Sequence, residues 1–208
     1  MTSPIPINLA FEDGLLESLS MKLLGTISTA YATRTIYNRG GYGYLKRTIG
    51  GFNNAAKGIP FFVATDLDKH ECPPVLIADW LTLPKHPNLM IRVAVREAEA
   101  WVLADRENFA NFLGISVANV PVDVEALPNP KEALIQLARR SRKGQVRDDI
   151  CPRPNSTSRV GPNYNARLSS FVSQVWDPNV ARLNSQSLDS TIDRLVSFRP
   201  NWATPPRS

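Results

Sequence analysis

Three short segments of the chain are rich in apolar residues, and acidic residues follow each of them closely. Residues 5–13 (IPINLAFED) carry apolar side chains at alternating positions and end in Glu12 and Asp13. Residues 59–68 (IPFFVATDLD) and 88–95 (NLMIRVAV) contain nearly continuous apolar runs. Such runs are typical of strands that are buried on both faces of a parallel sheet. The pattern therefore predicts three strands of one parallel sheet.

Apolar residues spaced three or four positions apart predict helices between and after these strands. The expected helices cover residues 15–27, 44–57, 73–81, 96–114, 129–141, 165–176 and 185–198. Residues 148–165 are expected to form a loop, and the tail 199–208 to be poorly ordered. Strands that alternate with helices indicate an α/β fold with a parallel sheet flanked by helices. We expect an α/β core over residues 1–128, with residues 129–208 as a helical C-terminal extension packed on it.

Length, cysteine content and the N-terminal sequence narrow the class of protein. The 208 residues suffice for one large domain with its own core. Cys72 and Cys151 are too few for a disulfide framework, the N-terminus lacks the features of a signal peptide, and no apolar run is long enough to span a membrane. These features predict a cytoplasmic protein that does not enter a membrane. His70 and Cys72 lack a second Cys/His pair, which argues against a zinc site.

Basic residues exceed acidic ones and are clustered. The formal net charge is +5, and residues 138–147 (ARRSRKGQVR) are strongly basic. A basic surface favours a polyanionic partner such as nucleic acid. The candidate nucleic-acid-binding residues are Arg39, Lys46, Arg47, Lys69, Arg96, Arg139, Arg140, Arg142 and Lys143. The structural alternative is that residues 139–143 form only a solvated helix end, and that Arg96 only pairs with a neighbouring acid.

Acidic residues lie where all three predicted strands end. Residues two apart on a strand point to the same face, so a strand that continues to Asp68 would present Asp66 and Asp68 together. Glu12 ends the first strand, and Glu97 follows the third. Ligands of open parallel sheets bind at the carboxyl ends of the strands, and crowded carboxylates attract a hard cation such as Mg²⁺ or Mn²⁺. The sequence therefore predicts a metal site at this edge.

Each of these acids also has an ordinary structural interpretation. Asp66 and Asp68 could be turn or cap residues, and Glu97 could be a first-turn acid favoured by the helix dipole. Glu99 lies two helical positions after Glu97, about 200° around the axis, so the two side chains are not expected to face one site together. Trp101 on the same helix is expected to be a core residue rather than a platform for a nucleobase.

A glutamate after the first strand and an Asp-x-Asp after a later one resemble the Toprim fold of topoisomerases, primases and overcoming-lysogenization-defect (OLD) nucleases. Over residues 5–175 the chain is similar to the DUF4276 family of Toprim-like proteins, which are relatives of RloB-type defence components. The similar strings are AFEDGLLESLSMKLL, RGGYGYLK, FFVATDLDKHECPP, IRVAVREAEAWVLADRENFANFLGI, PNPKEAL and GPNYNARLSSFV. Most Toprim domains have Gly directly after the glutamate. Here Asp13 precedes Gly14, which leaves open whether Glu12 or Asp13 takes the family role.

The resemblance implies a Mg²⁺- or Mn²⁺-dependent nuclease that cleaves DNA or RNA. It implies that Asp66 and Asp68 hold the metal, that Glu12 completes the site or acts as general acid or base, and that Glu97 is a further catalytic residue. It also implies a role as effector of a bacterial anti-phage defence system, with a co-encoded ATPase as partner. Two alternatives stay open: a non-catalytic module that regulates such an ATPase complex, and another phosphoryl-transfer enzyme that acts on a nucleotide.

Overall fold

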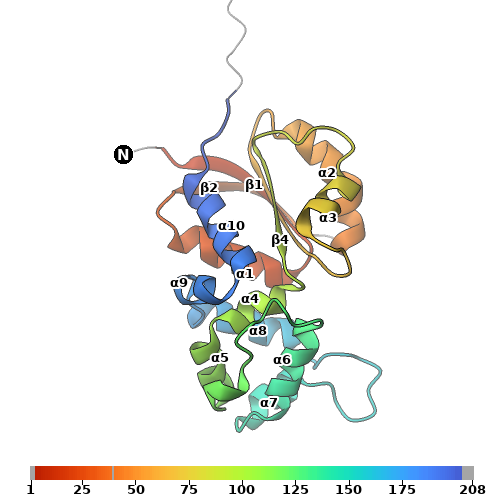
Figure 1. Ribbon diagram of the computed structural model, residues 1–208, viewed down its shortest axis with the longest axis vertical. Helices are drawn as coiled ribbons and strands as arrows, with labels where there is room; N and C mark the ends of the chain where they lie inside the picture. The colour runs from red at the N-terminus through yellow and green to blue at the C-terminus, as the bar shows by residue number, and fades with distance from the viewer. Residues whose placement is uncertain (1–2, 39, 203–208) are drawn as a thin grey trace, which may run out of the picture.

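The computed structural model describes residues 3–38 and 40–202, and in this part of the chain a parallel sheet has helices on both faces (Figure 1). The sheet contains β1 (Ile5–Phe11), β2 (Tyr31–Tyr37), β3 (Phe61–Asp66) and β4 (Leu89–Ala94), in the order β2-β1-β3-β4, with every neighbouring pair parallel. The predicted α/β class is confirmed, as are the flanking helices and the helical C-terminal part. Three strands lie where the apolar segments predicted them.

The helices alternate with the strands in the first half of the chain and follow one another in the second. The α-helices are α1 (Gly14–Thr26), α2 (Gly41–Ala55), α3 (Pro73–Trp80), α4 (Ala98–Ala104), α5 (Arg106–Leu113), α6 (Pro130–Arg139), α7 (Gly144–Ile150), α8 (Tyr164–Gln174), α9 (Pro178–Ala181) and α10 (Gln186–Ser197). Two 3₁₀ turns, η1 (Val117–Asn119) and η2 (Arg182–Asn184), complete the set in the described residues. None of these helices combines the length and the apolar composition that crossing a membrane requires.

The strand β2 is absent from the sequence prediction. It lies at the edge of the sheet and exposes its central residues, among them Thr33, Arg34 and Thr35. An edge strand whose side chains are largely exposed needs no alternation of apolar residues, so periodicity did not reveal it.

The prediction that β3 continues to Asp68 is wrong. The strand ends at Asp66, after which Leu67 is buried and Asp68 adopts a left-handed backbone conformation with φ of 51°. The amide N–H groups of Leu67 and Asp68 both donate to the carbonyl oxygen of Arg96, at 3.1 and 2.9 Å. Asp66 and Asp68 therefore do not share a strand face, and a turn places Asp68.

Two other boundaries differ from the prediction. The helix expected at 96–114 is interrupted at Asp105, whose buried carboxylate accepts hydrogen bonds from the side chain of Asn108 at 2.9 Å and the backbone N–H of Asp177 at 2.8 Å. The loop expected at 148–165 is shorter, because α7 continues to Ile150 and α8 begins at Tyr164. In both places tertiary contacts override the local sequence pattern. Part of the tail expected to be poorly ordered, residues 203–208, lies outside the described residues.

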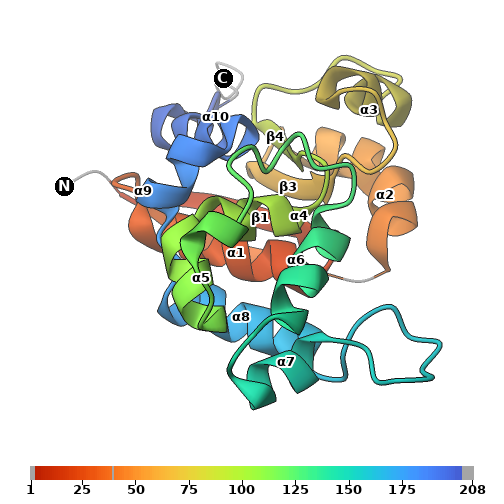
Figure 2. The same ribbon diagram turned by 60° about the horizontal axis from the view of Figure 1, so that its bottom comes forward.

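The two faces of the sheet bury separate hydrophobic clusters. The smaller one packs α2 and α3 on the sheet through residues such as Leu45, Phe52 and Trp80. The larger one joins the opposite face to α1, α4 and the C-terminal helices, as the rotated view in Figure 2 shows. Trp101 is fully buried there, as expected, and the indole N–H of Trp176 donates to its carbonyl oxygen at 3.0 Å. Residues on both sides of position 128 therefore contribute to one core.

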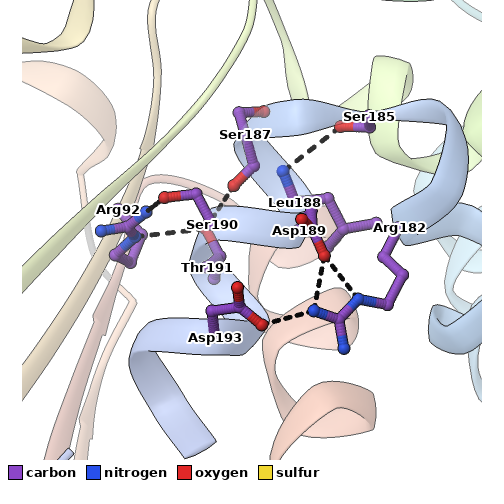
Figure 3. A network of polar contacts seen from close by, with 9 residues as sticks. All are labelled: Arg92, Arg182, Ser185, Ser187, Leu188, Asp189, Ser190, Thr191 and Asp193. Carbon is purple, nitrogen blue, oxygen red and sulfur yellow. Dashed lines mark hydrogen bonds and ion pairs between the residues drawn. The ribbon is translucent and has the colours of Figure 1, made fainter. Parts of the chain in front are cut away.

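Polar contacts fix α10 beside the edge strand β4 (Figure 3). The guanidinium of Arg92 on β4 donates to the hydroxyls of Ser190 at 2.7 Å and Thr191 at 3.2 Å. Arg182 in turn pairs with Asp189 and Asp193 at 2.5 Å, which joins the start of α10 to η2. The helix thus covers part of an edge that would otherwise present unpaired backbone groups.

Gly161 supports the loop between α7 and α8 by a close backbone approach. Its N–H donates to the carbonyl oxygen of Ile150 at 2.9 Å, and an added methyl group would lie 2.7 Å from the carbonyl carbons of Asp149 and Ile150. We expect Gly161→Ala to lower the free energy of unfolding by about 1–3 kcal/mol, since the backbone has to shift. Gly51→Ala, in open space on α2, should instead raise it by about 0.5–1 kcal/mol. Urea denaturation of both variants measures this, and equal effects would contradict the packing at Gly161.

Candidate active site

Glu12 lies directly after β1 and is held against the end of β3. Its Oε2 accepts hydrogen bonds from the hydroxyl of Thr65 at 2.5 Å and from the backbone N–H of Asp66 at 3.2 Å. Asp13 has a different position, since its Oδ1 accepts the N–H of Leu16 at 2.9 Å and caps α1. Of the two acids that the sequence left open, Glu12 is the one that contacts the neighbouring strand end. Burial, and then the charges of Asp68 and Asp13, raise the pKa of Glu12.

Asp66 is the last residue of β3 and is almost completely buried. Its Oδ1 accepts the N–H of Ala98, the first residue of α4, at 2.8 Å. This bond places the carboxylate between the sheet edge and a helix N-terminus. Burial raises the pKa of Asp66 well above its ordinary value, and the charges of Glu99 and Glu12 add to this effect.

Glu99 is absent from the site residues that the sequence predicts. It directly follows Ala98, whose N–H donates to Asp66, and its charge contributes to the raised pKa of Asp66. It is 1% exposed, its Oε1 accepts the phenol of Tyr164 at 2.8 Å, and the ammonium of Lys131 lies 3.4 Å from the same oxygen. Its Oε2 is buried and has no hydrogen-bond partner among the described residues. Burial raises the pKa of Glu99, although Lys131 and Tyr164 counteract this. An unpartnered buried carboxylate oxygen is uncommon, and in the described residues the same holds for Oδ1 of Asp105, which lies outside this site.

Glu97, the fourth predicted catalytic residue, is turned toward α6. Its Oε2 accepts the backbone N–H of Lys131 at 2.8 Å, near the N-terminus of that helix. The expectation that Glu97 and Glu99 do not share one orientation agrees with this arrangement. A signal for Glu99 was present in the sequence, because residues 98–104 (AEAWVLA) are apolar or small apart from this glutamate. A charge inside an apolar helix segment is unusual unless it is paired or has a function.

Asp68 lies on the exposed turn that follows β3. The guanidinium of Arg96 donates to the carbonyl oxygens of Asp68 at 3.3 Å and His70 at 2.7 Å, so it holds the backbone of this turn. The imidazole of His70 stacks on Tyr42 with ring centroids 6.0 Å apart. Asp68 follows Asp66 by two residues, and its charge contributes to the raised pKa of both Glu12 and Asp66.

Glu12, Asp66, Asp68 and Glu99 form what we call the acidic cluster. Within residues 3–38 and 40–202, no three Asp, Glu, His or Cys side chains are arranged so that they could hold a metal ion as they stand. The donor chemistry fits a hard divalent cation, because the cluster consists of carboxylates and contains the unpartnered oxygen of Glu99. Side-chain movements, above all of the exposed Asp68, would be needed to bring three of these oxygens onto one ion.

The predicted nucleic-acid-binding residues differ in their surroundings. Arg39 lies outside the described residues. Lys46 pairs with Asp79 at 2.6 Å, which neutralises its charge. Lys143 donates to the carbonyl oxygen of Asn111 at 2.8 Å. The exposed side chains near α2, the turn after β3 and the end of α6 include Arg47, Lys69, Arg139, Arg140 and Arg142.

Comparison of the chain with protein-family models, with curated proteins and with solved structures found no match. The resemblance to Toprim-like proteins thus rests on the motifs of the sequence, and the properties that it implies enter below as proposals.

Proposed function

We propose that this protein is a Mg²⁺- or Mn²⁺-dependent nuclease that hydrolyses phosphodiester bonds of DNA or RNA. The acidic cluster carries the proposal: Glu12, Asp66 and Glu99 from three segments converge at the carboxyl edge of a parallel sheet, and one buried oxygen of Glu99 lacks a partner among the described residues. Carboxylates that repel one another are costly to the fold, and a divalent cation relieves that cost. The resemblance to Toprim-type nucleases agrees with the same chemistry.

The side chains of the cluster suggest separate tasks. A bound divalent cation supplies charge stabilisation at a phosphate oxygen. Asp66 and Asp68 would hold it, with Glu12 completing the oxygen ligands. Thr65 and the N–H of Asp66 orient Glu12, and its raised pKa also suits it to accept a proton from an attacking water. Lys131 forms an ion pair with Glu99 at 3.4 Å, which offsets part of the negative charge of the cluster.

A second function has one observation in its favour. In the described residues, no three acids are already arranged so that they could hold a metal ion. A regulatory module without catalytic activity needs no such arrangement. In that case the chain would bind a co-encoded ATPase or nucleic acid and would not cleave it. We place the nuclease first because carboxylates from three segments meet at one edge of the sheet, which is costly without a cation, and because Toprim-type nucleases, which the sequence resembles, use such carboxylates. In either case we propose a bacterial anti-phage system with a partner ATPase as the biological setting.

The direct test is cleavage of plasmid, single-stranded DNA and total tRNA with Mg²⁺ or Mn²⁺ and with EDTA, with and without the neighbouring ATPase. Cleavage that EDTA abolishes supports the nuclease and identifies its substrate. If no substrate is cut under any condition while the chain binds the ATPase, the regulatory module replaces the nuclease.

We expect Glu12→Gln to lower the cleavage rate about 10²-fold or more, because the amide can neither accept a proton nor neutralise a cation. Glu107→Gln on α5 is the matched control, since it removes the same charge at an exposed position. Initial rates at saturating metal measure both variants. Equal rates for the two would exclude Glu12 from the reaction.

A further inference from the structure

We propose that the cleft along α6 binds a single-stranded segment of nucleic acid whose next phosphate reaches the acidic cluster. This inference rests on the proposed function for what happens at the cluster. It adds the class of substrate, the path of the strand and the residues that hold it.

The cleft has a volume of about 430 Å³ and lies between one face of α6 and the loop that follows α7. Lys131, Ile135 and Arg139 are four residues apart on the helix and therefore line the same side of the cleft. Pro152 and Arg159 from the loop line it as well. The cleft thus presents cationic groups together with an apolar surface.

The residues that line the cleft do not include the acidic cluster, but one of them, Lys131, connects the two. Lys131 lines the cleft, and its ammonium is 3.4 Å from Oε1 of the buried Glu99. The outer end continues into a second hollow of about 580 Å³, because Arg139 lines both, and Arg147 and Arg153 line the second one. Basic side chains therefore follow a path that leads away from the cluster.

The acids along this path are partly engaged within the protein. Glu97 accepts the backbone N–H of Lys131, Asp149 is paired with Arg167, and Asp148 is paired with Arg147. Glu132, which also lines the cleft, forms no ion pair within the described residues. Arg139 and Arg159 also form no ion pair within the described residues. Two exposed guanidinium groups without carboxylate partners in this part of the chain are suited to bind phosphates.

The size and chemistry of the cleft favour a single strand over a duplex. Its volume is at the lower end of the range of about 300–1,000 Å³ for small-molecule sites, which accommodates a nucleotide but not a double helix. Ile135 and Pro152 can contact the face of a base, while the amides of Asn129 and Gln136 can meet its edge. The face and the edge of a base are accessible when the base is unpaired and are hidden in a duplex.

The test measures binding without cleavage. Fluorescence anisotropy in EDTA would compare a labelled single strand of about twelve nucleotides, as DNA and as RNA, with the corresponding duplex. We expect tighter binding of at least one single strand. The double variant R139Q/R159Q should weaken it about tenfold or more and reduce the slope of log K against log salt by about 1.4, since two phosphate contacts are lost. The matched control R34Q/K57Q removes two exposed charges outside the cleft and should change neither quantity by a comparable amount.

The outcomes separate this inference from the proposed nuclease. Equal binding by R139Q/R159Q and the control, or equal affinity for duplex, would overturn the cleft, even if the wild type cleaves nucleic acid. Loss of binding confined to R139Q/R159Q would support the cleft, even if no metal gives cleavage. Thermal melting of each variant checks that the fold is intact.

Discussion

Asp66→Asn is expected to lower metal-dependent cleavage by about 10³-fold or more, and at the same time to stabilise the metal-free protein. Asparagine can still accept the N–H of Ala98 through Oδ1, so the contact with α4 is retained. It removes a buried negative charge that lies beside Glu12 and Glu99. Loss of a proposed metal ligand lowers the rate, and loss of repulsion favours the folded state.

The stabilisation should depend on pH in a defined direction. The pKa of Asp66 is raised in the folded state, so the folded protein binds a proton more tightly than the unfolded chain does. The free energy of unfolding of the wild type therefore falls as the pH rises above about 4. The loss is about 1.4 kcal/mol per pH unit, and it stops once the pH passes the raised pKa of Asp66. The asparagine side chain of Asp66→Asn does not titrate, so the variant does not lose this stability as the pH rises. The variant should melt above the wild type at pH 8 in EDTA, by about 2–4 °C for each kcal/mol, and the difference should shrink toward about pH 4.

Glu107→Gln is again the control, because it removes an exposed acid and should change the melting temperature little at either pH. An Asp66→Asn protein that melts below the wild type at pH 8 would show that the carboxylate stabilises the fold. An Asp66→Asn protein that still cleaves would exclude this residue as a metal ligand.

Trp176→Ala is expected to have the largest effect on stability. Trp176 is fully buried, and its indole N–H donates to the carbonyl oxygen of Trp101 at 3.0 Å. Removing a large buried side chain costs about 3–5 kcal/mol, a large part of the stability of an ordinary domain. Because one core includes residues on both sides of position 128, we expect the whole chain to unfold in a single transition at lower urea concentration.

Trp202→Ala is the matched control, since Trp202 is 49% exposed and its loss should change the stability by less than about 0.5 kcal/mol. Circular dichroism and tryptophan fluorescence would follow both unfolding curves. Two separate transitions in Trp176→Ala would contradict the shared core, and would show that residues 129–208 unfold independently.

The sequence predicted those parts of the fold that depend on a buried pattern. β1, β3 and β4 are apolar because helices cover both faces of the sheet at these strands. The edge strand β2 has no such requirement. The break at Asp105 depends on a hydrogen bond from Asp177, which is distant in sequence. Contacts of this kind cannot be inferred from local periodicity.

The sequence predicted at which edge of the sheet the acidic residues gather. It did not predict the contacts of each carboxylate. Glu12 and Asp66 converge there because parallel strands end together. The angle between Glu97 and Glu99 around the helix does not show which of them belongs to the site, because their side chains are oriented by contacts with other helices. Lys131 on α6 contacts Glu97 through its N–H and Glu99 through its ammonium. Only the three-dimensional arrangement shows that Glu97 binds the backbone of α6 while Glu99 is enclosed with Lys131 and Tyr164.

The contacts of Glu99 also bear on when the site forms during protein synthesis. Its phenol partner, Tyr164, is 65 residues further along the chain. At about 5–20 residues per second, that partner leaves the ribosome several seconds after Glu99 does. A nascent chain thus carries the acids before it carries the side chains that orient them. If the protein is a nuclease, its active site is complete only after most of the polypeptide has been synthesised.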